Sequence, residues 1–465
     1  MAFWAARSVA RPAASWATRP EVFRAATWPA RPDAFWAVSW FARPGAFWAA
    51  PWTALWTALW RTCRVIGAAP TLAGLAGVLA ALLQFAGALK TMPLLAALPF
   101  DLTLAAAAGL CGLLPLMLAH GGWRLGRGLA LPLLGAAGMW LWWVVAGAWS
   151  VNANAAVAKL LPMVLIGPIM LAAGLLVGAD GAGRRALVLA VTGIGIFVGA
   201  SVAWGLATDG VVLGGEVGAD PSRTRVQYQL AGLAVASAAG LVAVRLVASR
   251  GAGALLNGAL LLALLAASAI PGGRAALLAT AGVVLLMPVV SLWLGGRYAA
   301  AAAWLGMAAL AGLVGAGWLL SDPDRAAGIR GIERVFGDPA DGPEERVAMW
   351  RAALRMIEPA GIGPGGYPQA AGFGADPGMH PHNHALEALT EAGLPGLALW
   401  LLAFGGAAAL ALARLPRVEP ARAAAIGALV LPVAITVMVS TDLTNRMAWF
   451  ALGLALSLGV NRARV

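Results

Sequence analysis

The fold of this chain is decided by residues 253–294, GALLNGALLLALLAASAIPGGRAALLATAGVVLLMPVVSLWL. Two uncharged apolar runs, 253–270 and 275–294, are each close to the length at which an α-helix crosses the hydrocarbon core of a bilayer. Between them stands the short polar sequence PGGR, residues 271–274. Because proline and glycine end a helix and arginine avoids the hydrocarbon core, this stretch predicts two membrane-spanning helices joined by a turn.

The same pattern of long apolar runs continues on both sides of this stretch. Of the 465 residues, 61% are hydrophobic and 11% are charged, which predicts one integral membrane domain, residues 65–465, rather than several soluble domains. Twelve spans are expected, at residues 71–89, 97–119, 129–149, 157–178, 186–208, 226–249, 253–270, 275–294, 299–320, 393–413, 421–440 and 446–461. The predicted fold class is an all-α polytopic membrane protein with about twelve transmembrane helices.

The charged residues between the spans predict how the chain crosses the membrane. The net charge is +12, but the basic residues concentrate in alternate short connections, as topology signals do, so no nucleic-acid partner is expected. With a cytoplasmic amino terminus, the cytoplasmic connections contain Arg124, Arg127, Arg184, Arg185, Arg245, Arg250, Arg297, Arg414, Arg417, Arg422, Arg462 and Arg464, against only Asp180 and Glu419. Both termini are therefore expected in the cytoplasm.

The first 64 residues form a separate, low-complexity segment. Units of the form ARP-x-x-x-WA recur from Ala10, Ala30 and Ala42, and the spacing of the prolines forbids a long helix in most of the segment. We expect a disordered tail or an over-extended translation start. The alternative is an Arg/Trp-rich arm that lies on anionic lipid.

The longest polar stretch follows the ninth span, at residues 321–392, on the expected outer face. Residues 321–384 contain nine of the chain's twenty acidic residues and six arginines. The stretch is therefore too polar for lipid, and a loop of this length is usually functional.

Two local patterns stand out within this loop. Residues 344–358 place Val347, Trp350, Ala353, Leu354 and Ile357 at helical spacing, which predicts an amphipathic helix lying on the membrane face. Residues 361–366 predict a flexible glycine-rich turn. They do not predict a nucleotide-binding loop, because no strand precedes them and no helix follows at once.

Three of the four histidines lie within five residues near the end of this loop, at His380, His382 and His384. A neutral imidazole can accept a proton from a hydroxyl, which makes His382 a candidate general base, with Asn383 to orient it or to bind sugar. Alternate residues of an extended segment face one side, so the three imidazoles are also a candidate metal cluster, although no carboxylate or cysteine accompanies them at the usual ligand spacing. A third interpretation is a polar loop in which the histidines stand by chance.

Arginines on the expected outer face depart from the charge rule at Arg223, Arg225, Arg274, Arg346 and Arg446. Guanidinium groups stay charged and bind phosphate bidentately. Several of them at the outer interface would hold a diphosphate head group whose lipid tail remains in the bilayer. The alternative is a local role for each arginine, as a partner of nearby carboxylates or of lipid head groups.

The histidine segment resembles the motif of a known family. His382 and Asn383 are followed after nine residues by Gly393 and, after two more, by Gly396. This spacing, within HPHNHALEALTEAGLPGLALW, is similar to the pattern of the O-antigen ligase and O-antigen polymerase superfamily. Upstream, ERVAMWRAALRMIEPAGIGPGGY resembles the Arg-x-x-x-Trp helix and Gly-rich turn of that family, and PGGRAALL resembles its arginine at the start of a transmembrane helix.

The resemblance implies a metal-independent, inverting glycosyltransferase of the GT-C type, without a cofactor, in the inner membrane of a bacterium. Residues 321–392 would be its large periplasmic loop. The enzyme would transfer a glycan from an undecaprenyl diphosphate carrier to lipid A–core or to a growing glycan, so a ligase and a polymerase both remain open. A flippase or transporter of lipid-linked sugars would also use twelve helices, but it would favour ionisable residues near the membrane midplane and inverted repeats.

The resemblance also implies roles for particular residues. His382 takes the position of the family's essential histidine. The donor diphosphate would be held by Arg346, by Arg274, and by Arg225 or Arg223. The site would be supported by Asn383, His384 and Glu391.

Overall fold

The computed structural model describes residues 71–96, 98–213, 224–271, 273–322, 343–374 and 379–462. These all belong to the second of two compact units, Gly67–Val465. The low-complexity segment 1–64 and Arg223 lie outside the described residues.

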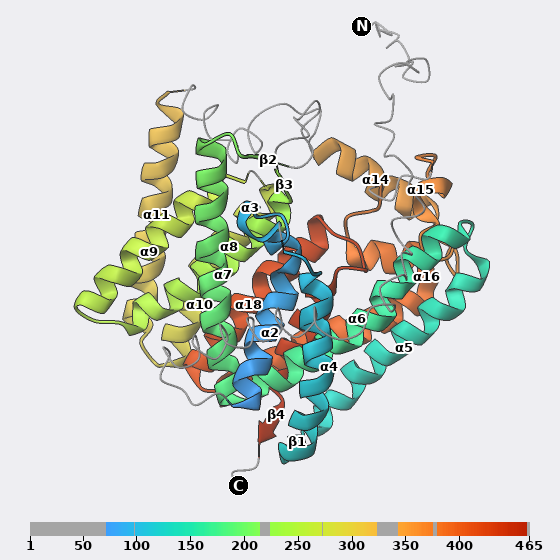
Figure 1. Ribbon diagram of the computed structural model, residues 1–465, viewed down its shortest axis with the longest axis horizontal. Helices are drawn as coiled ribbons and strands as arrows, with labels where there is room; N and C mark the ends of the chain where they lie inside the picture. The colour runs from blue at the N-terminus through green and yellow to red at the C-terminus, as the bar shows by residue number, and fades with distance from the viewer. Residues whose placement is uncertain are drawn as a thin grey trace, which may run out of the picture. The chain divides into compact units, whose positions relative to one another are not determined.

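Eleven helices in the described part of the chain are long and apolar enough to cross a membrane. They are α2 (Leu72–Leu89), α4 (Leu102–His120), α5 (Ala130–Ala146), α6 (Ala153–Ala179), α7 (Gly181–Ala207), α8 (Tyr228–Ala248), α9 (Ala252–Ala269), α10 (Arg274–Leu294), α11 (Tyr298–Leu320), α16 (His384–Trp400) continued by a π-helical turn (Leu401–Gly405) into α17 (Gly406–Arg414), and α18 (Pro420–Val439) (Figure 1). The predicted all-α polytopic membrane fold is confirmed.

The twelfth predicted span is a short helix, α19 (Arg446–Ser457), and its packing gives the reason. All of its residues after the first are buried. It approaches α6 so closely that a Cβ added at Gly174 would lie 2.3 Å from Phe450 O, and one added at Gly453 would lie 2.1 Å from Leu171 O. A helix enclosed by protein in this way needs no lipid-facing length, so the expected span 446–461 is too long.

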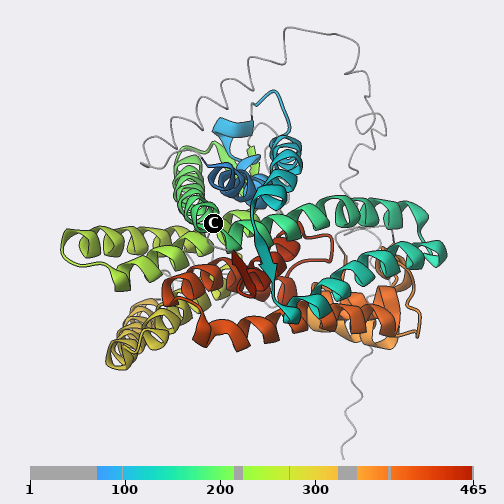
Figure 2. The same ribbon diagram turned by 90° about the horizontal axis from the view of Figure 1, so that it is seen from below.

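Short elements lie at the ends of the long helices. The helical turns are α3 (Pro93–Ala96), α15 (Tyr367–Ala370) and the 3-10 turns Arg127–Leu129, Gly147–Trp149 and Leu415–Arg417. The strands β1 (Trp123–Leu125) and β4 (Val460–Arg462) pair antiparallel, with Trp123 opposite Arg462, and β2 (Val211–Leu213) and β3 (Thr224–Val226) pair in parallel, with Val211 opposite Thr224 (Figures 1 and 2). The sequence does not predict these strands, because three residues are too few for an alternating pattern.

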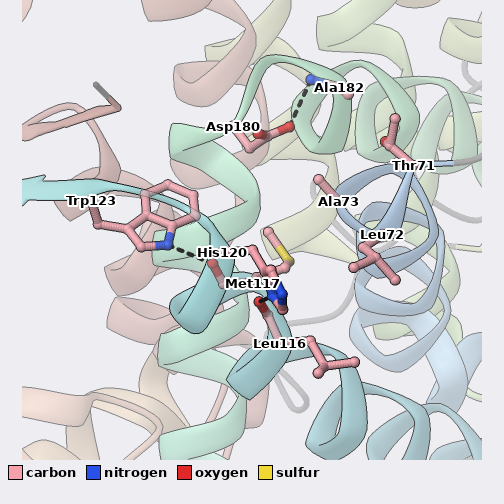
Figure 3. A pocket seen from close by; sticks show the side chains of 9 residues that line it. All are labelled: Thr71, Leu72, Ala73, Leu116, Met117, His120, Trp123, Asp180 and Ala182. Atoms are coloured by element: carbon pink, nitrogen blue, oxygen red, sulfur yellow. Dashed lines mark hydrogen bonds between the residues drawn. The ribbon is translucent and has the colours of Figure 1, made fainter. Parts of the chain in front are cut away.

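The two ends of the neighbouring helices α2 and α4 differ in character. At one end, Lys90 follows α2 and forms a half-exposed ion pair with Asp101, the N-cap residue of α4. At the other end, a cavity of about 250 Å³ lies between the start of α2 and the end of α4. Figure 3 shows this cavity, in which Trp123 Nε1 donates to Met117 O at 2.7 Å.

Arginines gather at this second end of the helices. Arg184, in the first turn of α7, donates from Nη1 to Gly178 O at 2.9 Å. Arg422, in the first turn of α18, donates from Nη2 to Ser457 O at 2.6 Å, at the last residue of α19. The pairing of β4 with β1 brings the chain after α19 to the same end. These contacts satisfy helix-terminal carbonyls, which have no partner within their own helix.

The amphipathic helix predicted in the polar loop is present as α14 (Pro343–Arg355). Its buried residues Met349 and Ala353 pack with Ile362 and Tyr367, and the Tyr367 hydroxyl donates to Met349 O at 2.9 Å. The buried face differs from the expected one, because Leu354 is 53% exposed. The neighbouring glycine-rich turn supplies the partners of α14, and those partners select Met349 rather than Leu354.

The glycine-rich segment 361–366 is a closely packed turn and not the flexible turn expected from sequence. Its first four residues are buried, and the N–H groups of Ile362 and Gly363 donate to Thr390 O at 3.0 Å and Glu391 O at 2.9 Å. These carbonyls belong to α16, which breaks at Gly393, where φ is 68° and ψ is −163°. The break leaves these carbonyls without hydrogen-bond donors from their own helix, and the N–H groups of the turn take the place of those donors.

Gly393→Ala is therefore expected to lower the free energy of unfolding by about 2–6 kcal/mol. The backbone angles at this residue are confined to glycine, and a Cβ there would lie 2.2 Å from Pro359 O. Strain and overpacking each contribute about 1–3 kcal/mol. Thermal unfolding in detergent measures the change, with Gly405→Ala in the same long helix as control, since a Cβ at Gly405 meets nothing within 4 Å. Equal unfolding midpoints for the two variants would contradict this account of the turn.

Candidate active site

The histidine segment leads into α16, and Asn383 is the N-cap of that helix. Asn383 Oδ1 accepts a hydrogen bond from Leu386 N–H at 3.0 Å, and its Nδ2 donates to Met438 O at 3.1 Å. Asparagine is a preferred N-cap because its side chain satisfies a backbone N–H that has no helical partner. The same side chain thus fastens the histidine segment to the end of α18.

The rings of His380 and His382 lie against each other, with centroids 3.9 Å apart. The backbone at His382 is left-handed, with φ at 52°, which is uncommon for a residue other than glycine. His382 Nδ1 lies 3.3 Å from Ser440 O. Since a carbonyl oxygen only accepts, Nδ1 carries the proton of the neutral ring in this contact and Nε2 is left unprotonated.

The third imidazole has different surroundings. His384 is fully buried, with Nε2 3.4 Å from Thr441 Oγ1 and its ring edge toward Phe404. Within the described ranges, no three His, Cys, Asp or Glu side chains converge as ligands for a metal ion. The three histidines therefore do not form the cluster that a metal site would require.

Burial and neighbouring charges keep the first two histidines neutral. The pKa of His382 is lowered by burial and by the positive charge of Arg346, and burial beside His382 lowers the pKa of His380 to about 3. Asp442, between α18 and α19, is close enough to interact with His380. Burial acts to raise the pKa of Asp442, but the charge of Lys159 and a hydrogen bond from Thr444 outweigh it and the pKa is lowered. Near neutral pH, two neutral imidazoles thus lie close to an ionised carboxylate.

Arg346 reaches this site from α14. It stands one helical turn before Trp350, whose Nε1 donates to Pro381 O at 2.7 Å. Residues four apart share one face of a helix, so the bond of Trp350 to the histidine segment also turns Arg346 toward it. The positive charge of Arg346 acts on His382, whose pKa it lowers.

The other two described arginines of the predicted set lie near the starts of α8 and α10. Arg274 is half-buried and begins α10, and a Cβ at the preceding Gly273 would lie 3.8 Å from Gln229 Cα. Arg225 is exposed in β3, two residues before Gln227. The structure therefore places these arginines beside α8.

A groove of about 580 Å³ extends from the start of α8 to the histidine segment. Its polar lining residues include Lys90, Gln227, Gln229, His380, Asp442 and Arg446, and its apolar ones include Pro162, Ile166 and Leu230. The lining histidine is His380, and His382 lies against it outside the lining. Arg225, Arg274 and Arg346 are also outside the lining. A space lined by cationic, hydrogen-bonding and apolar groups suits an amphipathic substrate.

A buried ion cluster that the sequence analysis does not predict lies next to the histidine segment. Lys159 of α6 pairs with Glu387 and, at 2.7 Å, with Glu391, and the side chains of all three residues are at most 10% exposed. Glu387 Oε2 accepts Leu443 N–H at 2.8 Å, and Glu391 Oε2 accepts Gly365 N–H at 3.0 Å. The cluster therefore joins α6, α16, the glycine-rich turn and the connection before α19.

One signal in the sequence points to this cluster. Lys159 is one of only two lysines in the chain and stands inside the predicted span 157–178. An ionisable residue in an apolar span is a functional candidate by default. Its partners Glu387 and Glu391 are four residues apart, which places both carboxylates on one face of α16.

Residues 259–401 match the sequence model of a family described as O-antigen ligase. The resemblance to the O-antigen ligase superfamily is confirmed. No curated protein matches the chain. The O-antigen ligase match contains Arg274, Arg346 and His382, whereas Lys159 and Asp442 lie outside it but meet the matched residues in the fold.

Members of the O-antigen ligase superfamily are glycosyltransferase-like ligases and polymerases of lipid-linked glycans. Two observations on this chain agree with that class. It is a multi-pass membrane protein, and the matched range contains the histidine segment.

Proposed function

We propose that this protein transfers a glycan from an undecaprenyl diphosphate carrier to lipid A–core at the periplasmic face of the bacterial inner membrane. The observation that carries the proposal is the state of His382. Its ring is neutral, with Nε2 unprotonated, and it lies beside the charge of Arg346 and behind His380, which lines a polar groove. This is the state that a general base needs before the reaction.

The reaction follows from these groups. His382 Nε2 accepts the proton of an acceptor hydroxyl as the oxygen of that hydroxyl attacks the anomeric carbon of the donor sugar. The bond from this carbon to the carrier diphosphate breaks on the opposite face, so the configuration at the carbon inverts. Negative charge grows on the leaving diphosphate, and we assign Arg346, Arg274 and Arg225 to stabilise it. Arg223, outside the described residues, has the same assignment. The scheme has no step through a metal ion or cofactor.

The distribution of arginine supports a periplasmic position for the site. Arg184 and Arg422 lie at the helix ends opposite the groove. Because short connections rich in arginine stay in the cytoplasm, we place both termini there and residues 321–392 in the periplasm. The segment with the candidate base is then exposed to substrates that have already crossed the inner membrane.

A polymerase and a flippase are the two alternatives to the ligase. A polymerase of the same superfamily would use the same base and groove with a growing glycan as acceptor. A flippase for lipid-linked sugars is favoured by one observation, the buried Lys159, because intramembrane charges often mark transport pathways. Lys159 is paired with both Glu387 and Glu391, and these bonds hold the segment that contains His382, which favours the enzyme.

The test is glycan transfer by the purified full-length protein. It is given an undecaprenyl diphosphate-linked glycan and EDTA, with and without lipid A–core. Product that forms only with lipid A–core supports the ligase, and longer carrier-linked chains without lipid A–core support the polymerase. No transfer in either mixture would overturn the proposed function.

Arg274→Ala and Arg346→Ala are each expected to weaken use of the donor by at least about tenfold. A hydrogen bond to a charged group contributes about 1.5–3 kcal/mol, and the diphosphate bears charge in both the ground state and the transition state. Steady-state rates over a range of donor concentrations measure the effect.

Matched control substitutions are available on α14 and just beyond α10. Arg351→Ala removes an exposed arginine from α14, and Arg297→Ala removes one beyond the far end of α10. The variant Arg346→Ala carries a second readout, because the charge of Arg346 lowers the pKa of His382. Without it, that pKa rises, His382 is protonated at a higher pH, and the acid limb of the pH–rate profile moves upward. Unchanged donor use in both Arg274→Ala and Arg346→Ala would show that these arginines do not bind the diphosphate and have local structural roles.

A further inference from the structure

A second, smaller cavity lies beyond the groove, between α6 and the glycine-rich turn. Its volume is about 180 Å³. The lining residues include Ala158, Lys159, His380, Glu391, Asp442 and Thr444. The functions considered above leave this space without an occupant.

The cavity shares a wall with the groove. His380, Asp442 and Thr444 line both spaces, and the ring of His382 lies against that of His380. A hydroxyl at this wall would therefore lie near the imidazole pair, with the groove on the other side. Transfer with inversion requires this arrangement, because the attacking oxygen and the leaving diphosphate occupy opposite faces of the same carbon.

Glu391 supplies an independent sign that the cavity receives a ligand. Its side chain is fully buried, and Oε2 already accepts from Lys159 at 2.7 Å and from Gly365 N–H at 3.0 Å. Among the described residues, Oε1 has no hydrogen-bond partner. A buried carboxylate oxygen without a donor costs about 1–3 kcal/mol or more, and a ligand hydroxyl that reached Oε1 would relieve this cost.

We propose that this cavity binds the terminal sugar of the acceptor glycan, with a sugar hydroxyl donating to Glu391 Oε1 and a neighbouring hydroxyl directed at the wall shared with the groove. The proposal rests on the glycosyltransferase function proposed above. It makes Glu391 and Ala158 determinants of which acceptor is used.

The charges of the two spaces favour this division of substrates. The cavity is lined by the carboxylates of Glu391 and Asp442, and its one cation, Lys159, is neutralised by Glu387 and Glu391. Such a lining repels a diphosphate and accepts hydrogen bonds from hydroxyls. The groove shares Asp442 but adds the cations Lys90 and Arg446 and apolar lining residues, which suits the lipid-linked donor.

The test fills the cavity without touching the ion cluster. Ala158 is an exposed residue of α6 that lines the cavity, so Ala158→Phe places a ring in the space that the sugar would occupy. We expect the KM for the acceptor to rise about 10- to 200-fold, the range for a steric change in a binding pocket, while the KM for the donor stays within about twofold. Ala153→Phe is the matched control, because Ala153 is exposed on the same helix and lines neither space.

The outcomes separate this proposal from the proposed function. Lipid A–core is the acceptor in the assay, or the carrier-linked glycan if the wild type elongates it. No transfer by the wild type would refute the proposed function itself. Transfer by the wild type with an unchanged acceptor KM in Ala158→Phe would overturn the acceptor cavity alone, and so would equal donor and acceptor effects. Ala158→Leu, with a smaller side chain that favours helix, gives the same readout if Ala158→Phe does not fold.

Discussion

His382→Ala is expected to abolish glycan transfer while binding of the carrier-linked donor stays close to that of the wild type. Loss of a general base lowers the rate about 10²- to 10⁴-fold. Donor binding is spared because the diphosphate is assigned to the arginines and the apolar chain to the groove. The measurement is single-turnover transfer at saturating donor, together with an equilibrium binding assay for the donor.

A second substitution separates the lost base from a disturbed backbone. His382 has φ at 52°, and asparagine adopts this left-handed conformation more readily than alanine. His382→Asn therefore keeps the backbone and removes the base, and it should be as inactive as His382→Ala. If both variants retained transfer, the base would have to be His380, which lines the groove, or His384.

Lys159→Met is expected to lower the free energy of unfolding by about 3–5 kcal/mol. It leaves the carboxylates of Glu387 and Glu391 buried without their cation, and removal of one partner from a buried ion pair costs about 3–5 kcal/mol. Both carboxylates lie on the first half of α16, next to the histidine segment, so transfer should be lost together with stability. Thermal unfolding in detergent and the transfer assay measure the two effects.

The chain contains its own control for this substitution. Lys90 also pairs with a carboxylate, Asp101, but these side chains are 37% and 42% exposed. Surface pairs contribute about 0–1 kcal/mol, so Lys90→Met should change stability little. The triple variant Lys159→Met, Glu387→Gln and Glu391→Gln removes the buried charges together and should recover much of the stability. A triple variant no more stable than Lys159→Met would show that packing, and not charge, explains the loss.

The apolar spans are predictable from sequence because each one is a local property of about 20 residues. The sequence prediction is wrong where the burial of a segment depends on a packing partner from elsewhere in the chain. α19 is shorter than its apolar run because α6 packs against it. Likewise, the turn at 361–366 is rigidly held because a break in α16 presents carbonyls to it, and no local pattern reveals that partner.

The residues of the site also differ in whether the sequence predicts them. His382 is found from the clustering of the histidines and from the motif that begins with it. Lys159 and Asp442 are not found, because they reach the histidine segment only through the packing of α6 and of the connection before α19. The lone lysine in an apolar span was the available signal, but a single residue does not name its partners.

The apolar lining residues of the groove, Pro162, Ile166 and Leu230, have a consequence for the proposed polyprenyl-linked donor. If its chain binds along these residues without leaving the hydrocarbon phase, the donor loads by lateral diffusion in two dimensions. The quantity that sets the reaction rate is then the mole fraction of carrier among the surrounding lipids and not its amount per volume of solution. Diluting the donor with inert phospholipid should slow transfer even when the total of every component in the tube is unchanged.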